Sequence, residues 1–238
     1  MSTDEIFLSF PTPQVRAIFL SRPQRFLAKM EFFDGSQTLA YCANSGSMTG
    51  CLVTGSPALL WDSEEPKRKR LFTWRAIELD GVWVGTDTHF ANRIVEEALL
   101  QLLIPGLTCY DKLERERILE IGHRVDFLLT EASGVCYIEV KSATIVENGV
   151  ARFPDSITPR GLKHLEGLTR KAEEGHRVVL IYLIQRGDVE SFTVSNTHHP
   201  AYAEAFKRAV KAGVETIAIS VTVNVEGFSR PRVLPVNF

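Results

Sequence analysis

The chain has 238 residues, of which 45% are hydrophobic and 24% charged, and its formal net charge is −2. This composition excludes a chain that is mainly disordered, and the small negative charge argues against a protein that coats nucleic acid through an overall positive field. Its apolar runs are shorter than the roughly 20 residues that a membrane-spanning helix needs, and at about 150 residues per domain the length predicts two domains.

The first ten residues and the cysteines indicate the compartment. Asp4 and Glu5 lie where a secretory signal would have a basic start, and no long apolar stretch follows them. The four cysteines form no Cys-x-x-Cys pair and have no histidine at zinc-ligand spacing. We therefore expect a cytoplasmic protein without a disulfide framework or a structural zinc.

Short strand-like segments fill residues 1–85, the predicted first domain. Turns at Asp34-Gly35 and Asp80-Gly81 separate paired segments, because Asp tolerates and Gly favours the positive φ of tight hairpins. Several short strands joined by turns predict a small β-barrel, and the OB-fold is one candidate that binds oligonucleotides. The predicted strands span 15–20, 26–33, 37–43, 58–62, 70–79 and 82–86.

Helices and strands alternate in residues 86–238, the predicted second domain. Apolar residues at helical spacing from Ile94 to Leu103 predict a helix that ends at Pro105-Gly106. A second helix begins at the N-cap Thr158 and ends near Gly175. An α/β domain follows from this order, with a meander over 112–121, 124–130 and 135–141, a buried strand over 178–185, a helix over 201–212 and a strand over 214–224.

Charged residues interrupt two apolar strands of the predicted meander. Glu139 and Lys141 project from one face of their strand, and Asp126 lies 13 positions before Glu139, across a turn. Paired carboxylates suit Mg²⁺ or Mn²⁺, and a neighbouring lysine can stabilise developing negative charge or orient water. A solvated strand end with an ordinary ion pair explains the same spacing. A third carboxylate is available in Glu96 or Glu97, between which helical-wheel arithmetic does not choose.

Asp126 and Glu139-x-Lys141, in this element order, resemble the core of the PD-(D/E)XK nuclease superfamily. A longer ordered set of motifs is similar to the sugar fermentation stimulation protein A family. The chain departs from that family at Ser45, where Thr is usual, and at His123, where Ser is usual. The set comprises Arg25-Phe26-Leu27-Ala28, Asn44-Ser45-Gly46-Ser47-Met48, Lys67-Arg68-Lys69, Arg124-Val125-Asp126-Phe127, Ile138-Glu139-Val140-Lys141 and the segment from Phe153-Pro154-Asp155 to Lys163-His164-Leu165.

The resemblance implies an N-terminal OB-like barrel, a PD-(D/E)XK nuclease-type three-layer α/β domain, DNA binding and a regulatory link to sugar (maltose) metabolism. It also implies that Asp126, Glu139 and Lys141 form the active site. Position by position, Glu97 rather than Glu96 matches the acidic helix residue, which makes Glu97 a further catalytic residue and metal ligand.

Three segments carry residues suited to nucleic acid. The basic run at 67–70 would contact phosphates without reading sequence, although a charge run is also typical of a solvated loop. The small residues at 44–48 form either a simple turn or a loop whose N–H groups reach a phosphate. Cations in the first turn of the helix after Thr158 oppose its macrodipole unless an anion lies nearby. The predicted contacts are Lys67, Arg68, Lys69, Arg70, Asn44, Ser47, Arg160, Lys163 and His164.

Together these features predict a DNA-binding protein with a metal-dependent deoxyribonuclease site, which contacts DNA mainly through its backbone. The alternative is a non-catalytic DNA-binding regulator, for which the resemblance supplies the link to sugar (maltose) metabolism. RNA is a third option, because an OB-like barrel does not discriminate the sugar.

Overall fold

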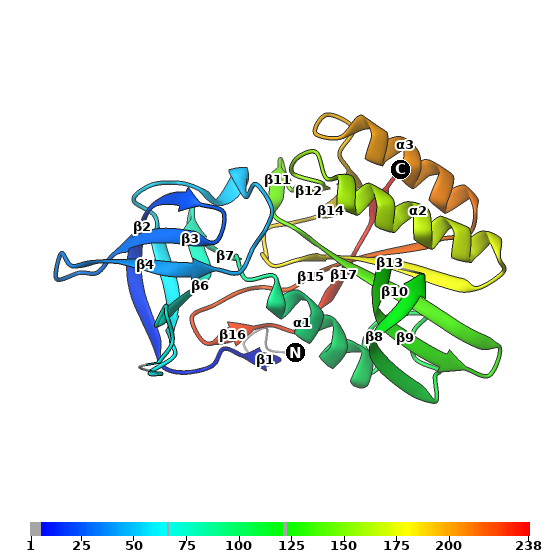
Figure 1. The fold of residues 1–238 in the computed structure, drawn as a ribbon, viewed down its shortest axis with the longest axis horizontal. Helices are drawn as coiled ribbons and strands as arrows, with labels where there is room; N and C mark the ends of the chain where they lie inside the picture. Colours follow the sequence, from blue (N-terminus) through cyan, green and yellow to red (C-terminus); the bar gives the residue numbers. More distant parts are fainter. Residues whose placement is uncertain (1–5, 66, 121–122) are drawn as a thin grey trace.

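The structure, a computed structural model, describes residues 6–65, 67–120 and 123–238. A β-barrel and an α/β domain lie side by side along the long axis of the molecule (Figure 1). Among the described helices, none combines the length and the apolar character needed to cross a membrane.

The first domain is the expected barrel. Its strands follow the order β4-β3-β2-β5-β6, and a further pairing between β4 and β6 closes the barrel. Asp80 and Gly81 both adopt positive φ in the turn between β6 and β7, as the sequence predicts. Phe19 and Trp74 stack in the barrel core with ring centroids 5.0 Å apart. The strands are β2 (Gln14–Gln24), β3 (Leu27–Glu31), β4 (Gln37–Cys42), β5 (Pro57–Asp62), β6 (Phe72–Leu79) and β7 (Val82–Gly85).

A six-stranded sheet in the order β17-β15-β13-β10-β9-β8 forms the centre of the second domain. Strands β10, β13 and β15 are parallel, while β8, β9 and β10 form the expected antiparallel meander. The strands are β8 (Lys112–Glu120), β9 (His123–Glu131), β10 (Gly134–Ala143), β13 (Arg177–Ile184), β15 (Glu215–Ser220) and β17 (Arg232–Leu234).

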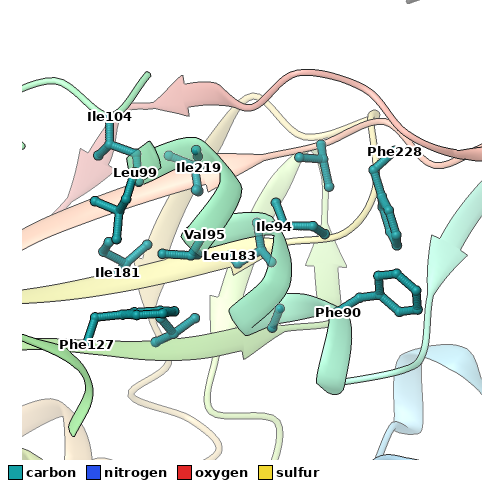
Figure 2. Close-up of a cluster of buried hydrophobic side chains, with 14 of the residues drawn as sticks. Phe90, Ile94, Val95, Leu99, Ile104, Phe127, Ile181, Leu183, Ile219 and Phe228 are labelled. Carbon is teal, nitrogen blue, oxygen red and sulfur yellow. The ribbon is translucent and has the colours of Figure 1, made fainter. Parts of the chain in front are cut away.

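Helices cover both faces of this sheet and make the domain three-layered. α1 (His89–Leu100) packs on one face, where Ile94, Val95 and Leu99 meet apolar side chains of β13 and β15 (Figure 2). α2 (Pro159–Glu173) and α3 (Pro200–Lys211) lie together on the other face (Figure 1). Because the central strands are buried on both faces, they read as continuous apolar runs such as 178–184.

A second, four-stranded sheet was not predicted. Its order is β11-β12-β14-β18, and β12 ends directly before the loop that leads into α2. The strands are β11 (Ile145–Glu147), β12 (Val150–Phe153), β14 (Ser191–Val194) and β18 (Val236–Asn237). A short 3-10 helix, η1 (Thr49–Cys51), lies beside β11.

The N-terminal segment packs on the second domain although it precedes the barrel. β1 (Leu8–Ser9) pairs with β16 (Gly227–Phe228), and Phe10 packs against Phe90 at 5.3 Å and against Phe228 at 4.7 Å between ring centroids. The predicted range 1–85 therefore includes residues that belong to the core beneath α1.

Direct contacts join the barrel to the α/β domain. Gly85 N–H donates to the carbonyl of Gln185 at 2.8 Å. A Cβ at position 85 would lie 2.6 Å from Gln185 Oε1, so only glycine allows this approach. Thr88 Oγ1 donates to the Ala43 carbonyl at 2.7 Å and ties the start of α1 to the barrel. These contacts fix the end of β7 and the barrel loop that follows β4 against the second domain.

Candidate functional site

Strands β9 and β10 separate at Asp126. Their backbone pairing ends where Phe127 faces Ile138. Beyond that point, a side-chain oxygen of Asp126 accepts the hydrogen bond of a β10 N–H group in place of a backbone carbonyl of β9. Asp126 Oδ2 accepts the N–H of Val140 at 2.7 Å, and its Oδ1 accepts from Asn92 Nδ2 at 2.7 Å. The carboxylate is thereby held in the fork between the two strands.

Glu139 is the buried centre of the site. Its Oε1 accepts from Lys141 Nζ and from His164 Nδ1, the latter at 2.7 Å. Burial alone would raise the pKa of Glu139, but the charges and hydrogen bonds of Lys141 and His164 hold this pKa at about 2. Glu139 is therefore ionised although its side chain is only 4% exposed.

Asp126 has the opposite shift. Burial raises the pKa of its carboxyl, and the negative charge of Glu139 raises it further. The buried carboxylate of Glu139 and the half-buried one of Asp126 thus repel each other across the fork. A cation bound to both would offset this repulsion, and an all-oxygen pair completed by water suits a hard ion such as Mg²⁺.

Lys141 completes the predicted trio. Its side chain is 14% exposed and forms an ion pair with Glu139. Because Lys141 also lines the cleft described below, the ammonium group can face both the carboxylate and a bound anion. The structure therefore brings together Asp126, Glu139 and Lys141, as the sequence predicts.

The expected helix ligand Glu97 does not join this cluster. Its Oε1 accepts instead from Gln101 Nε2 at 2.7 Å, and it is not among the described residues that line the cleft. Glu96 lies 3.4 Å from Arg115 in an ion pair. The side chain of α1 that reaches Asp126 is Asn92. Sequence reasoning missed Asn92, because a search for carboxylates passes over an amide.

The trio opens into a cleft of about 890 Å³ between the two domains. The barrel contributes the turn between β2 and β3 and the loop after β4, and the second domain contributes α1, the fork, β10 and the start of α2. Four arginines line this space, of which Arg124 pairs with Glu116 at 3.5 Å and Arg152 with Glu147 at 2.8 Å. Arginines beside carboxylates suit a phosphate backbone around a metal ion. These arginines are Arg25, Arg124, Arg152 and Arg160.

The loop 44–48 is held by internal hydrogen bonds. Arg22 donates to the carbonyls of Asn44 at 2.7 Å and Gly46 at 2.8 Å. The N–H of Gly46 donates to Asn44 Oδ1 at 2.8 Å, and that of Met48 donates to Asp155 Oδ2 at 2.8 Å. Two of the N–H groups expected to reach a phosphate are therefore engaged within the protein.

Asn44 and Ser47, two of the predicted nucleic-acid contacts, lie in this loop. Ser47 Oγ donates to the Asp155 carbonyl at 3.3 Å, and Asn44 Nδ2 donates to the Thr86 carbonyl at 3.1 Å. Asn44 still lines the cleft. The loop thus links the two domains and forms part of the cleft wall.

The basic run lies elsewhere on the barrel, between β5 and β6. Arg68 places its guanidinium over the Trp61 ring, 5.0 Å from the centroid. None of Lys67, Arg68, Lys69 and Arg70 is among the described residues that line the cleft. The structure does not bring this run to the fork.

The first turn of α2 faces the site. Thr158 caps the helix as predicted, since its Oγ1 accepts the N–H of Gly161 at 3.1 Å. His164 points to Glu139, and Arg160 lines the cleft with its Nε 3.4 Å from His164 Nε2. Lys163 is exposed and lines an adjoining pocket of about 860 Å³.

His123, outside the predicted site residues, lies behind this cluster. Its side chain is 1% exposed, and its ring centroid lies 3.8 Å from that of His164. Burial lowers the pKa of His123 to about 4, with a further contribution from His164, so the ring is neutral at physiological pH. The only sequence signal was the departure from the usual family residue at this position.

Comparisons with known proteins agree with this architecture. Residues 20–86 match the family described as the SfsA N-terminal OB domain, and residues 89–227 match the sugar fermentation stimulation protein RE domain. A sugar fermentation stimulation protein homolog of Ruegeria sp. (strain TM1040) is 40% identical over 231 residues, which cover 96% of this chain and 100% of that protein. A homolog of Thioalkalivibrio sulfidiphilus (strain HL-EbGR7) is 40% identical over 232 residues, covering 97% and 98%.

A solved structure shares the whole fold. The structure of Pyrococcus furiosus SfsA in complex with Ca²⁺ aligns with a TM-score of 0.90 at 24% sequence identity, covering 98% of this chain and 100% of that chain. Fold and site together define a two-domain protein that joins an OB barrel to a three-layer α/β domain. The chain belongs to the sugar fermentation stimulation protein family.

Proposed function

We propose that this protein binds DNA in the interdomain cleft and hydrolyses phosphodiester bonds with the help of a divalent metal ion. The observation that carries this proposal is the convergence of Asp126, Glu139 and Lys141 at the strand fork, inside a cleft lined by arginines. Fold alone does not imply the activity, so the proposal rests on the chemistry of these side chains.

Asp126 and Glu139 would hold the metal ion. Both carboxylates face the cleft, and the raised pKa of Asp126 reflects burial and repulsion that a cation would offset. Such an ion polarises a phosphoryl oxygen and lowers the pKa of a bound water. Mg²⁺ or Mn²⁺ fits the oxygen donors, and the similar Pyrococcus furiosus protein was solved in complex with Ca²⁺, another oxygen-preferring ion.

Lys141 would stabilise the negative charge that develops on the phosphate during attack. Its ammonium group is held beside the metal ligands by the ion pair with Glu139, so it needs no rearrangement to act. The arginines of the cleft wall, with Arg160 at the start of α2, would bind the flanking phosphates. The segment 67–70 would contact DNA further from the fork.

The test is cleavage of single-stranded, duplex and branched DNA, with matched RNA, in Mg²⁺ or Mn²⁺. Wild type is compared with Glu139→Gln, which keeps the shape of the side chain and removes its charge. Circular dichroism and a DNA-binding measurement confirm that both proteins are folded and bind. We expect wild type to cut DNA and the variant to bind without cutting.

A second candidate is a DNA-binding regulator of sugar metabolism that does not cut. Glu139 favours it, because Lys141 and His164 already satisfy Oε1 of this carboxylate without a metal. Equal binding by wild type and Glu139→Gln, with no cleavage of any substrate, would support this candidate and contradict the nuclease.

A further inference from the structure

Buried polar atoms without partners lie behind the fork. Among the described residues, three such atoms are found there in two side chains: both ring nitrogens of His123 and the Oε2 of Glu139 have no hydrogen-bond partner. The His123 and Glu139 side chains are 1% and 4% exposed. Such groups are costly to bury, and a neutral imidazole always presents one nitrogen with a free lone pair.

These atoms face one another. His123 Nε2 lies 4.0 Å from Glu139 Oε2, too far for a hydrogen bond. His164 Nδ1 lies 2.7 Å from the other oxygen of the same carboxylate. One ligand atom from each of the three side chains can be chosen so that all lie within 4.8 Å of one another.

We propose that His123, Glu139 and His164 form a binding site for a borderline transition-metal ion, with Zn²⁺ as its occupant. Two imidazoles and one carboxylate are a ligand set found in zinc sites that keep a fourth position open. Imidazole nitrogen also separates this site from the oxygen-only pair at Asp126, because it suits Zn²⁺ better than Mg²⁺.

The two imidazole rings must separate to close on an ion, because their centroids lie 3.8 Å apart with the rings tilted by 36°. Ligand atoms bound at about 2.1 Å around a tetrahedral ion lie about 3.4 Å apart. The ion would take the place of the hydrogen bond between His164 and Glu139, and its binding would release that proton. Lys141 bonds Oε1, which leaves Oε2 available on the side of His123.

Access and space for the site are visible in the packing. The pocket of about 860 Å³ beside the cleft is lined by both His123 and His164 and gives an ion a route to them. Gly167 of α2 makes room for the buried ring, since a Cβ there would lie 2.9 Å from His123 Nδ1.

Zinc binding at this site does not depend on DNA cleavage, although Glu139 is shared between the two metal sites. Zn²⁺ binding is measured on the full chain by calorimetry in excess Mg²⁺, with metal content determined after dialysis. We expect one tight site in wild type and at least about 100-fold weaker binding in His123→Gln, since even loss of a partner that only orients a ligand costs roughly 10- to 100-fold.

His176→Gln is the matched control, because its Nε2 also lies 4.0 Å from a carboxylate, that of Glu174, but at an exposed position. This variant should bind Zn²⁺ as wild type does. Asp126→Asn should lose Mg²⁺ and keep Zn²⁺, which separates this inference from the proposed nuclease. Wild type without a tight site, or His123→Gln and wild type with equal affinity, would overturn the proposal.

Co²⁺ provides a second readout that does not depend on a variant's folding. Bound by two imidazoles and a carboxylate with an open position, Co²⁺ should give the intense visible absorption of a four- or five-coordinate ion. The weak absorption of a six-coordinate ion with oxygen ligands would contradict the site.

Discussion

Asp155 lies in the loop after β12, and its carboxylate is hydrogen-bonded to the loop after β4. Replacing Asp155 tests how much this hydrogen bond stabilises the contact between the two domains. Asp155 Oδ2 accepts the N–H of Met48 at 2.8 Å, and Met48 is completely buried. Asp155→Ala leaves this N–H without a partner inside the protein. Hydrogen bonds to charged groups contribute about 1.5–3 kcal/mol, so we expect the free energy of unfolding to fall by about 2 kcal/mol.

Urea unfolding followed by circular dichroism measures this loss, and the midpoint of thermal unfolding should fall by about 4–8 °C for a chain of this size. Asp155→Asn keeps an acceptor oxygen and should lose less. Glu204→Ala is the control, because Glu204 accepts from Lys207 at 2.7 Å in an ion pair whose side chains are 59% and 68% exposed, and should cost little stability. Equal losses in Asp155→Ala and Glu204→Ala would refute the reasoning.

Further predictions concern the helix cap, the fork and the proposed DNA-binding surface. Thr158→Ala removes the N-cap of α2 and should lower the free energy of unfolding by about 1 kcal/mol, measured by urea unfolding. The raised pKa of Asp126 means that its stabilising contribution is complete at low pH and is lost as pH rises through that pKa. In metal-free buffer, Asp126→Asn should therefore gain stability relative to wild type as the pH rises above about 4, the ordinary pKa of an aspartate, and a constant difference would contradict the raised pKa. Arg160→Ala should make the slope of log binding constant against log salt concentration shallower by about one, the value for one lost phosphate contact. An unchanged slope would show that Arg160 does not contact the DNA backbone.

The long periodic elements of this fold could be predicted from the sequence because their pattern is local. Alternation and turn residues indicated the barrel strands, and the N-cap Thr158 marked the start of α2 correctly. The sheet of β11, β12, β14 and β18 could not be predicted, since strands of two to four residues show no clear period and pair over long distances. The pairing of β1 with β16 joins segments near the two ends of the chain, and the sequence pattern did not predict it either.

In the site, too, contacts between neighbouring strands could be predicted from the sequence, and a contact between a helix and the sheet could not. The spacing of Asp126, Glu139 and Lys141 pointed to neighbouring strands, and the structure places all three in one cleft. Which polar side chain of α1 reaches Asp126 depends on where the helix crosses the sheet. The preference for Glu97 over Glu96 came from the resemblance, and periodicity could not reveal that Asn92 makes this contact.

The most direct test of the proposed chemistry is single-turnover cleavage of DNA by wild type and Lys141→Met, with metal and protein in excess over DNA. Lys141 is the member of the trio that is not a proposed metal ligand, but it contacts Glu139, so metal and DNA binding by the variant are measured separately and cleavage is compared with both saturated. The proposal predicts that wild type cuts the DNA and that Lys141→Met binds it with a rate of cleavage lower by at least about 100-fold, the loss typical of one group that stabilises transition-state charge. Cleavage at the same rate by both proteins, or by neither, would contradict it.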